Sequence, residues 1–303
     1  MFSAPLLSLV LSAILCATPM LPTPQTPEDT ASAVEESATP ALSAEELAAL
    51  AQTKASTLDA AALTATLPLL PHYDASRTER YLACAQDSSW TLEQVIRIVN
   101  TDNDLTYFDD AQSVDLTQGD LILVNKLHRL ESSYVPDDLV TVEPAYSNGG
   151  KLKSEVNDAF CAMVEAMWKE TGLRLVNASP YRSYSTQRSL YARYYARDGA
   201  AADRYSAHAG YSEHQTGLAL DVIAPGGTLR GFKNTEQFVW LRDNAHRFGF
   251  ILRYGDGMEY ITGYQYEPWH YRYVGTEAAA VIYQTGLTFE EYYAYYVAGA
   301  SGT

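Results

Sequence analysis

The amino-acid sequence predicts an α+β fold in which a small antiparallel sheet is flanked by helices. Segments with the 3.6-residue apolar period of helices are interleaved with short apolar runs typical of strands. These elements follow no regular strand–helix–strand repeat, so a doubly wound parallel sheet is disfavoured. With 303 residues, 47% of them apolar, the chain can form one large domain with extensions or two small domains.

The helices are predicted from apolar spacing and from residues that start or stop a helix. The best-delimited helix follows Ser154, carries apolar side chains from Val156 to Trp168, and stops at Gly172. The alanine-rich residues 43–70 have little aromatic content to anchor them and predict one or two weak helices. Another helix is expected from a cap at Ser89 or Thr91 to about Asn100. Glycine stops end two further expected helices, at 185–197 before Gly199 and at 235–248 before Gly249. Two short helices are expected at the C-terminus.

Short apolar runs between these helices predict the strands. We expect strands at residues 121–125, 173–176, 218–223, 250–252 and 271–274. The run at 218–223 is followed by Pro225-Gly226-Gly227, which is a turn signal, and it contains one acidic residue, Asp221.

The N-terminus has the character of an export segment. Leu6 to Ala17 is almost wholly apolar but too short for a confident membrane span, and Pro-, Thr- and Glu-rich sequence follows it. No Lys or Arg precedes the apolar run, and Cys16 leaves lipid attachment open. We therefore expect residues 1–18 to be a signal peptide or membrane anchor, 19–70 a low-complexity spacer with weak helical tendency, and 71–300 the folded domain. The mature protein would be secreted or associated with the cell envelope.

Charge and cysteine content exclude several classes of protein. The formal net charge of −16 argues against a nucleic-acid partner, because no basic cluster is concentrated enough to neutralise phosphates. Because of this negative charge, contact with a membrane is expected only through the N-terminal segment. The three cysteines form no Cys-x-x-Cys pair, so a cysteine-ligated zinc is disfavoured. Whether Cys84 and Cys161 form a disulfide stays open.

Two motifs contain the residue types of a hydrolytic zinc site. Residues 212–221 read Ser-Glu-His-Gln-Thr-Gly-Leu-Ala-Leu-Asp, and residues 267–270 read Glu-Pro-Trp-His. They supply two imidazoles, one carboxylate suited to a metal and one spare carboxylate. Such a site needs three protein ligands, an open position for water, and a base that deprotonates that water.

The position of each carboxylate adds to this interpretation. Asp221 lies in an apolar strand, where an unpaired carboxylate costs several kcal/mol, so it needs a cation, either Zn²⁺ or an arginine. Pro268 pushes the preceding Glu267 toward an extended conformation, which predicts a strand or strand entrance rather than a helix. Since an ideal strand points residues 267 and 270 to opposite faces, both can reach one metal only if the chain bulges or turns there.

The order and spacing of these residues resemble the VanY-type D-alanyl-D-alanine carboxypeptidases, which are related to lysostaphin-type peptidases and the hedgehog signalling domain. The resemblance rests on Ser212-x-His214-x6-Asp221 followed by Glu267-x-Trp269-His270. Weaker support comes from the upstream segments Leu123-Val124-Asn125-Lys126, Tyr134-Val135-Pro136-x-Asp138-Leu139, and Ser179-Pro180-Tyr181-Arg182-Ser183 with Gln187. It spans roughly residues 79 to 298, and Pro180 stands where the family commonly has glycine.

The resemblance implies a role for each site residue. His214, Asp221 and His270 would bind one catalytic Zn²⁺ on the small sheet, and Glu267 would be the catalytic base. Arg182, Gln187 and Ser212 would hold the terminal carboxylate of the substrate, for which the planar fork of an arginine is suited. Residues 71–300 would then be a zinc carboxypeptidase domain. His208 is expected to be a loop residue outside the metal site.

The function implied is that of an exported carboxypeptidase, which removes the terminal D-alanine from peptidoglycan stem peptides. Within the family, an LD-carboxypeptidase or a D-Ala-D-Ala dipeptidase is the alternative. A non-catalytic, zinc-containing module that binds the cell wall is another alternative. Glu267 argues against that module, since pure binding needs no base.

Overall fold

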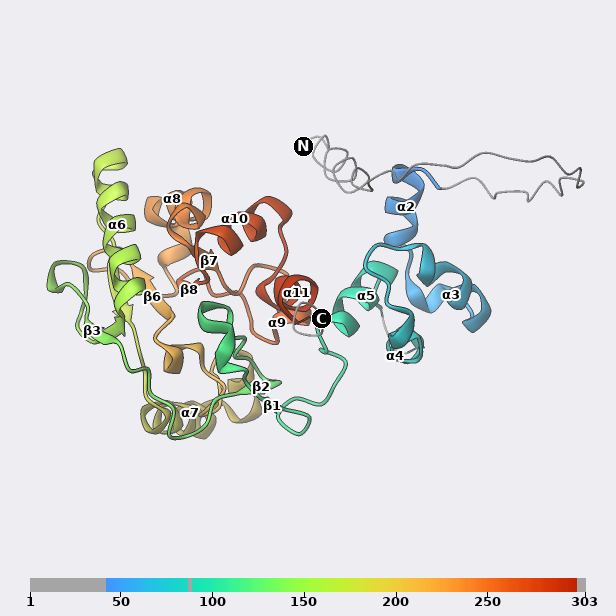
Figure 1. Ribbon diagram of the computed structural model, residues 1–303, viewed down its shortest axis with the longest axis horizontal. Coiled ribbons are helices and arrows are strands. Elements are labelled where there is room, and N and C mark those ends of the chain that lie inside the picture. Colours follow the sequence, from blue (N-terminus) through green and yellow to red (C-terminus); the bar gives the residue numbers. More distant parts are fainter. Residues whose placement is uncertain (1–41, 87–88, 299–303) are drawn as a thin grey trace, which may run out of the picture.

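The computed structural model describes residues 42–86 and 89–298 of the chain (Figure 1). It has the mixed helix and sheet architecture that the sequence predicts, with small antiparallel sheets. The expected export segment at residues 1–18 and Cys16 lie outside the described residues. Among the described helices, none is both long and apolar enough to cross a membrane.

A four-stranded antiparallel sheet forms the centre of the molecule. Its strand order is β5 (Val176–Ser179), β6 (Ala219–Ile223), β8 (His270–Tyr273) and β7 (Phe250–Leu252). The strands predicted at 218–223, 250–252 and 271–274 are confirmed. The strand expected at 173–176 is displaced along the chain, since β5 begins only at Val176. The left-handed cap at Gly172 is followed by a connection whose Leu175 packs into the core.

Two smaller sheets lie beside the central sheet. The pair β3 (Leu139–Thr141) and β4 (Lys151–Lys153) is antiparallel, and the pair β1 (Gln112–Ser113) and β2 (His128–Arg129) is parallel.

The prediction of a strand at 121–125 is wrong. A 3₁₀ segment covers Leu116–Leu121, and the apolar side chains that follow are buried outside any named strand. The carbonyls of Asp120 and Ile122 accept hydrogen bonds from the Arg272 guanidinium, so a side chain satisfies backbone groups that a strand partner would otherwise satisfy.

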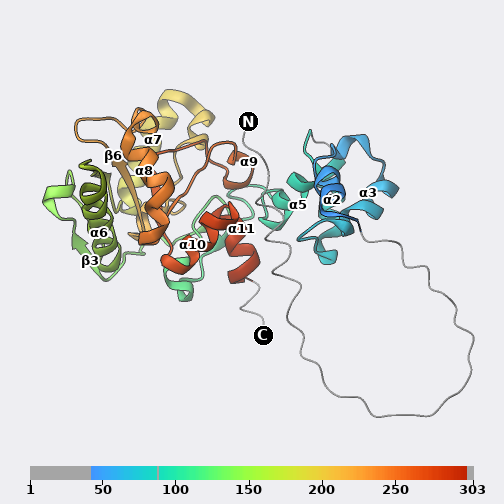
Figure 2. The ribbon, with the colours of Figure 1, turned by 90° about the horizontal axis from the view of Figure 1, so that it is seen from above.

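Helices on both sides of the central strands complete the main core. α6 (Ser154–Thr171) packs Phe160, Met163 and Met167 against sheet residues such as Leu220 and Tyr271. The helix predicted to follow Ser154 is confirmed but begins at Ser154 itself, and its predicted end is confirmed because Gly172 caps it in the left-handed conformation. The remaining helices of this part are α7 (Tyr184–Asp198), α8 (Glu236–Asn244), α9 (Glu259–Thr262), α10 (Thr276–Thr285) and α11 (Phe289–Tyr292). α7 lies on the opposite side of the strands from α10 (Figures 1 and 2).

The N-terminal helices form a unit with a core of its own, beside the main body (Figure 2). They are α2 (Ala44–Ala51), α3 (Ala60–Thr66), α4 (Thr78–Gln86) and α5 (Leu92–Asn100). The weak helices predicted over 43–70 are present as α2 and α3. Their core is completed by Tyr81 and Trp90, so the packing continues across residue 70. The unit meets the main body through α5, where Arg97 pairs with Glu291 of α11.

Candidate active site

Two strands and one short turn bring the predicted metal ligands together. Asp221 of β6 lies directly opposite His270 of β8 in the antiparallel register, which places both side chains on one face of the sheet. His214 comes from the 3₁₀ turn Glu213–Thr216, which ends at Gly217 with φ of 70°. A side chain at Gly217 would lie only 3.0–3.3 Å from β3 and β4 atoms, so this close approach requires glycine.

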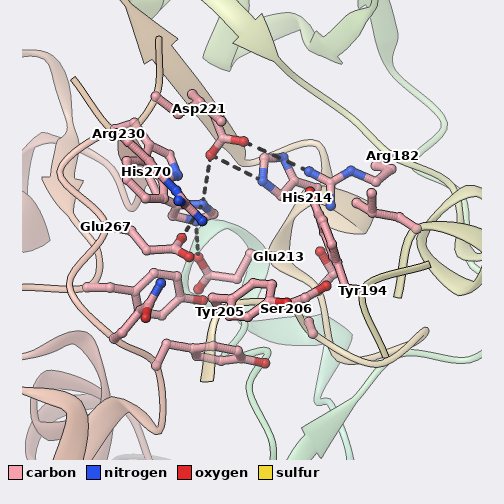
Figure 3. Close-up of a pocket in the computed structure, with 18 of the residues that line it drawn as sticks. Arg182, Tyr194, Tyr205, Ser206, Glu213, His214, Asp221, Arg230, Glu267 and His270 are labelled. Carbon is pink, nitrogen blue, oxygen red and sulfur yellow. Dashed lines mark hydrogen bonds and ion pairs between the residues drawn. The ribbon is translucent and has the colours of Figure 1, made fainter. Parts of the chain in front are cut away.

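The three candidate ligands form a compact buried cluster (Figure 3). One ligand atom from each of His214, Asp221 and His270 lies within 4.8 Å of the other two. Asp221 Oδ1 is 3.1 Å from His270 Nδ1 and 3.5 Å from His214 Nε2. In the described part of the chain, these residues are the group of His, Cys, Asp or Glu side chains close enough to hold a metal ion.

The ring nitrogen of each histidine that faces away from the cluster has its own acceptor. His214 Nδ1 is 2.9 Å from the carbonyl oxygen of Pro180, and His270 Nε2 is 3.2 Å from Glu213 Oε2. If a metal ion displaced the proton that His270 shares with Asp221, donation to these acceptors would leave His214 Nε2 and His270 Nδ1 free to act as ligand atoms. Histidines that ligate metals are usually oriented in this way, so the donor set fits a tetrahedral zinc with an open fourth position.

The loop that supplies the Pro180 carbonyl is shaped by a glycine elsewhere in the chain. Gly150 has φ of 100°, and a Cβ there would lie 2.4 Å from Pro180 Cγ. Gly150 therefore provides the space that the proline ring requires. The Pro180 carbonyl accordingly lies beside His214 although a proline stands at this position.

Glu213 is a site residue that the sequence analysis missed. Besides accepting from His270, its Oε1 accepts from Arg253 Nε at 2.7 Å and Arg272 Nη1 at 2.9 Å. Arg253 also pairs with Glu290 at 2.8 and 2.5 Å, and all four of these charged side chains are at most 1% exposed. Two carboxylates therefore balance two guanidiniums beneath the cluster. Burial opposes ionisation of Glu213, but the two arginines hold its pKa well below the usual range.

A sequence signal for this network did exist. Arg253 directly follows the strand run 250–252, and Arg272 lies inside the run 271–274. The reasoning that assigned a cation to Asp221 also requires a buried anion for each of these arginines.

Glu267 reaches the cluster because residues 267–270 form a turn. The amide of His270 donates to the Glu267 carbonyl at 3.1 Å, so the turn that the sequence analysis required is present. Glu267 Oε2 lies 3.9 Å from His270 Nδ1. Burial raises the pKa of Glu267 to about 8, and the nearby negative charge of Asp221 adds to that rise. This carboxyl is thus poised for proton transfer near neutral pH.

The buried acidic groups create a strong demand for positive charge at the cluster. Burial alone would lower the pKa of His270, yet its hydrogen bonds to Asp221 and Glu213 raise it to about 9. His214 differs, since burial and the nearby Arg182 lower its pKa. A divalent cation between these ligands would supply the charge that a proton on His270 otherwise provides.

The three residues expected to bind a carboxylate occupy different positions. Ser212 and Arg182 line the pocket, and Arg182 Nη2 is 3.9 Å from Asp221 Oδ2. Gln187 does not line the pocket: its Oε1 accepts from Arg182 at 2.5 Å, and its Nε2 donates to the Ala207 carbonyl at 2.6 Å. Gln187 thus holds Arg182 in place in this structure.

The pocket in front of the cluster has polar and aromatic walls (Figure 3). Trp269, which the turn carries between Glu267 and His270, lines it and also packs against the main core. The other lining side chains come from α7, from the segment before His214, from the 229–230 loop, and from the segment 254–265; they include Leu190, Tyr194, Arg197, Tyr205, Ser206, Leu229, Arg230, Tyr254 and Tyr264.

His208 lies outside the metal cluster, as expected. It pairs with Asp203 at 2.9 Å and stacks on Phe108. The cysteines Cys84 and Cys161 are both free, which resolves the question that the sequence left open.

Comparison with known proteins places these features in one family. A family model described as VanY, D-alanyl-D-alanine carboxypeptidase, matches residues 149–276, which include all seven predicted site residues. The D-alanyl-D-alanine carboxypeptidase of Enterococcus faecalis is 37% identical over 188 residues, covering 59% of this chain and 67% of that protein.

Two solved structures extend the comparison. The LdcB LD-carboxypeptidase is 38% identical with a TM-score of 0.57, covering 62% of this chain and 92% of that one. A mutant of the vancomycin resistance D,D-pentapeptidase VanY, in complex with Zn(II), is 36% identical with a TM-score of 0.50, covering 57% of this chain and 98% of that one.

Proposed function

Because the chain belongs to the VanY family of D-alanyl-D-alanine carboxypeptidases, we propose that it is an exported, zinc-dependent enzyme that removes the terminal D-alanine from peptidoglycan stem peptides. Membership makes the protein a peptidase, so the non-catalytic alternative is set aside. The observation that carries the proposal is the cluster of His214, Asp221 and His270 beside the raised-pKa carboxyl of Glu267.

The cluster has the ligand set of a catalytic zinc site. A zinc ion held by His214, Asp221 and His270 would acidify a water molecule and polarise the scissile carbonyl. Glu213 and the Pro180 carbonyl would fix the two imidazole rings so that their lone pairs face the ion.

Glu267 would move the proton during hydrolysis. Its carboxylate takes a proton from the attacking water and returns it to the amine that departs when the peptide bond breaks. The products are the shortened peptide with a new carboxylate and free D-alanine. A cation in the cluster favours the ionised form of Glu267, which is the form needed to accept the proton.

Arg182 would bind the terminal carboxylate of the peptide, with the Ser212 hydroxyl as a further donor. Arg182 lies on the pocket wall next to Asp221, so a carboxylate bound there leaves the scissile carbonyl close to the metal ligands. Gln187 would act mainly by orienting Arg182, since both ends of its amide are already hydrogen-bonded.

The LD-carboxypeptidase activity is the second candidate. It is supported by the similarity to LdcB, which is slightly higher in identity and TM-score than the similarity to the Zn(II)-bound VanY structure. The two activities differ in whether a pentapeptide or a tetrapeptide stem is shortened.

Mass spectrometry of stem peptides incubated with the zinc-loaded protein tests both candidates. The proposal predicts that the pentapeptide loses one alanine, that the tetrapeptide stays intact, and that a chelator stops the reaction until zinc is restored. Shortening of the tetrapeptide alone would favour the LD activity. If neither peptide is shortened, the proposed function is wrong. Export is tested separately by locating the native protein in cell fractions.

A further inference from the structure

Three arginines line the pocket, and two of them are already paired. Arg182 is held by Gln187 and Ser179. Arg197 makes a bidentate contact with Asp198 at 2.8–3.0 Å. Among the described residues, Arg230 has neither a hydrogen bond nor a carboxylate within 4 Å, although it lines the same pocket.

A shortage of acidic residues does not explain the unpaired state of Arg230. The chain has 37 acidic residues against 21 basic ones. The hydrogen bonds from Arg197 and Tyr205 lower the pKa of Asp198 to about 2, and Arg230 contributes the smallest part of that shift. Because Asp198 is already bonded to Arg197 and Tyr205, the charge of Arg230 remains available to a ligand.

The part of the chain around α7 carries an excess of arginine in an otherwise acidic protein, while the pocket itself is lined by three arginines and by the acidic residues Glu213, Asp221 and Glu267. Residues 182–205, which include α7, contain five arginines and two aspartates, whereas the whole chain has a net charge of −16. Such a local concentration of positive charge attracts anionic ligands. The loop that carries Arg230 adds to this charge at the pocket (Figure 3).

Arg182 and Arg230 lie beside different members of the metal cluster. In Figure 3, Arg182 is drawn beside His214 and Arg230 is drawn over His270. A peptide whose terminal carboxylate reaches Arg182, and whose scissile carbonyl lies at the cluster, therefore extends toward Arg230. The apolar neighbour Leu229 and the indole of Trp269 can contact the aliphatic part of that peptide.

We propose that Arg230 binds a second carboxylate of the substrate, carried by a residue N-terminal to the scissile bond. This inference rests on the proposed function. The preferred substrates are then stem peptides in which such a carboxylate is free. It can come from the α-carboxylate of a γ-linked glutamyl residue or from the side chain of a carboxylated diamino acid at the third position.

Three synthetic pentapeptides distinguish these sources. The first has a free glutamyl α-carboxylate and lysine at position three. The second has that carboxylate amidated and keeps lysine. The third is amidated and has diaminopimelate at position three. We expect kcat/KM on at least one carboxylate-bearing peptide to exceed that on the second by about 5- to 50-fold, as for a partly solvated charge-assisted contact.

The variant Arg230→Gln should remove this preference, so that its kcat/KM values on the three peptides become equal. Arg193→Gln is the matched control, because Arg193 lies on α7, is exposed, and is outside the pocket. That variant changes the net charge equally and should keep the preference. The peptide whose rate falls in Arg230→Gln identifies the source of the carboxylate.

Three results would overturn the inference. One is equal cleavage of all three peptides by the wild-type protein, and another is an unchanged preference in Arg230→Gln. The third is an equal loss in Arg193→Gln, which would show only general attraction to positive charge. By contrast, failure of the wild-type protein to cleave any of the three would refute the proposed function itself.

Discussion

Glu267 is the residue on which the proposed chemistry depends most. Its side chain is nearly isosteric with glutamine, but an amide cannot accept and return the proton. We predict that Glu267→Gln retains zinc and the fold while losing about 10²–10⁴-fold in kcat. Metal analysis, circular dichroism and single-peptide kinetics check this together. A variant that keeps a third of the wild-type rate would exclude the base role.

Zinc binding should release protons at neutral pH. In the metal-free protein the pKa of Glu267 is raised to about 8 and that of His270 to about 9, so both groups hold a proton at pH 7. A ligating imidazole must be neutral, and a nearby cation favours the carboxylate. We predict release of about one to two protons per zinc at pH 7, and less above pH 9, with affinity rising over that interval.

Calorimetry in buffers of different ionisation enthalpy measures this release. In Glu267→Gln, the number of protons released per zinc should fall by the part that Glu267 contributes. The part that His270 contributes should remain. A release of zero at pH 7 in the wild-type protein would contradict the protonation states described above.

Glu213 should control metal affinity through His270. In Glu213→Gln an amide donor can face the Nε2–H of His270, and one buried charge is lost. Zinc affinity should fall about 10- to 100-fold, as is common when a partner of a ligating histidine is removed. Glu290→Gln is the control, because it takes the same charge from Arg253 without touching His270. Equal zinc affinities in the two variants would show that Glu213 only stabilises the fold.

At this scale the sequence predicted what a buried charge demands but not which groups would meet. Asp221 could be assigned a cation because an acid in an apolar strand requires one. The contact between Glu213 and His270 joins residues 57 positions apart. Such a pairing is tertiary, so local spacing does not contain it.

Among the elements, α11 connects the helical unit to the active-site network. Its Glu290 faces Arg253 beneath the cluster, whereas Glu291 pairs with Arg97 of α5 at 2.6 Å and completes a capping box with Thr288. Glu291 is 1% exposed, so loss of its charge leaves Arg97 without its partner.

We predict that Glu291→Ala lowers the free energy of unfolding by about 1.5–3 kcal/mol, because it removes the charge-assisted hydrogen bonds of a partly buried ion pair. Thr288→Ala, which removes only the cap, should cost about 0.5–2 kcal/mol. Denaturant unfolding gives both values, and the double variant with Arg97→Ala should cost less than the sum of its parts. Equal effects of Glu291→Ala and Thr288→Ala would mean that the pair with Arg97 contributes nothing.

Elements with their own start and stop signals were predictable from sequence. The 154–172 helix is an example, since its apolar face and its Gly172 cap are both local. The prediction of a strand at 121–125 was wrong because an apolar run fits a buried loop as well as a strand. The guanidinium that satisfies carbonyls of this loop comes from Arg272, which is distant in the sequence. The helices at 44–66 looked weak because Tyr81 and Trp90, which complete their core, come later in the chain.

At the scale of the whole molecule, an acidic protein presents a pocket lined by three arginines. The sequence predicted no nucleic-acid partner from the net charge and the lack of a concentrated basic cluster, but the three arginines come together only because α7 and the Arg230 loop flank the same cluster. A free carboxylate on the substrate is the chemical feature that we propose this arrangement selects. The proposed carboxypeptidase activity therefore depends on Arg182 binding that carboxylate.

The most direct measurement compares one pentapeptide as the free acid with the same peptide amidated at its C-terminus. We predict that the zinc-loaded wild-type protein cleaves the free acid at least tenfold faster, and that Arg182→Ala lowers kcat/KM on the free acid by about 10- to 150-fold, as expected for a charge-assisted contact. The variant should change little on the amide. Equal cleavage of both peptides by the wild-type protein would contradict the account and indicate an endopeptidase.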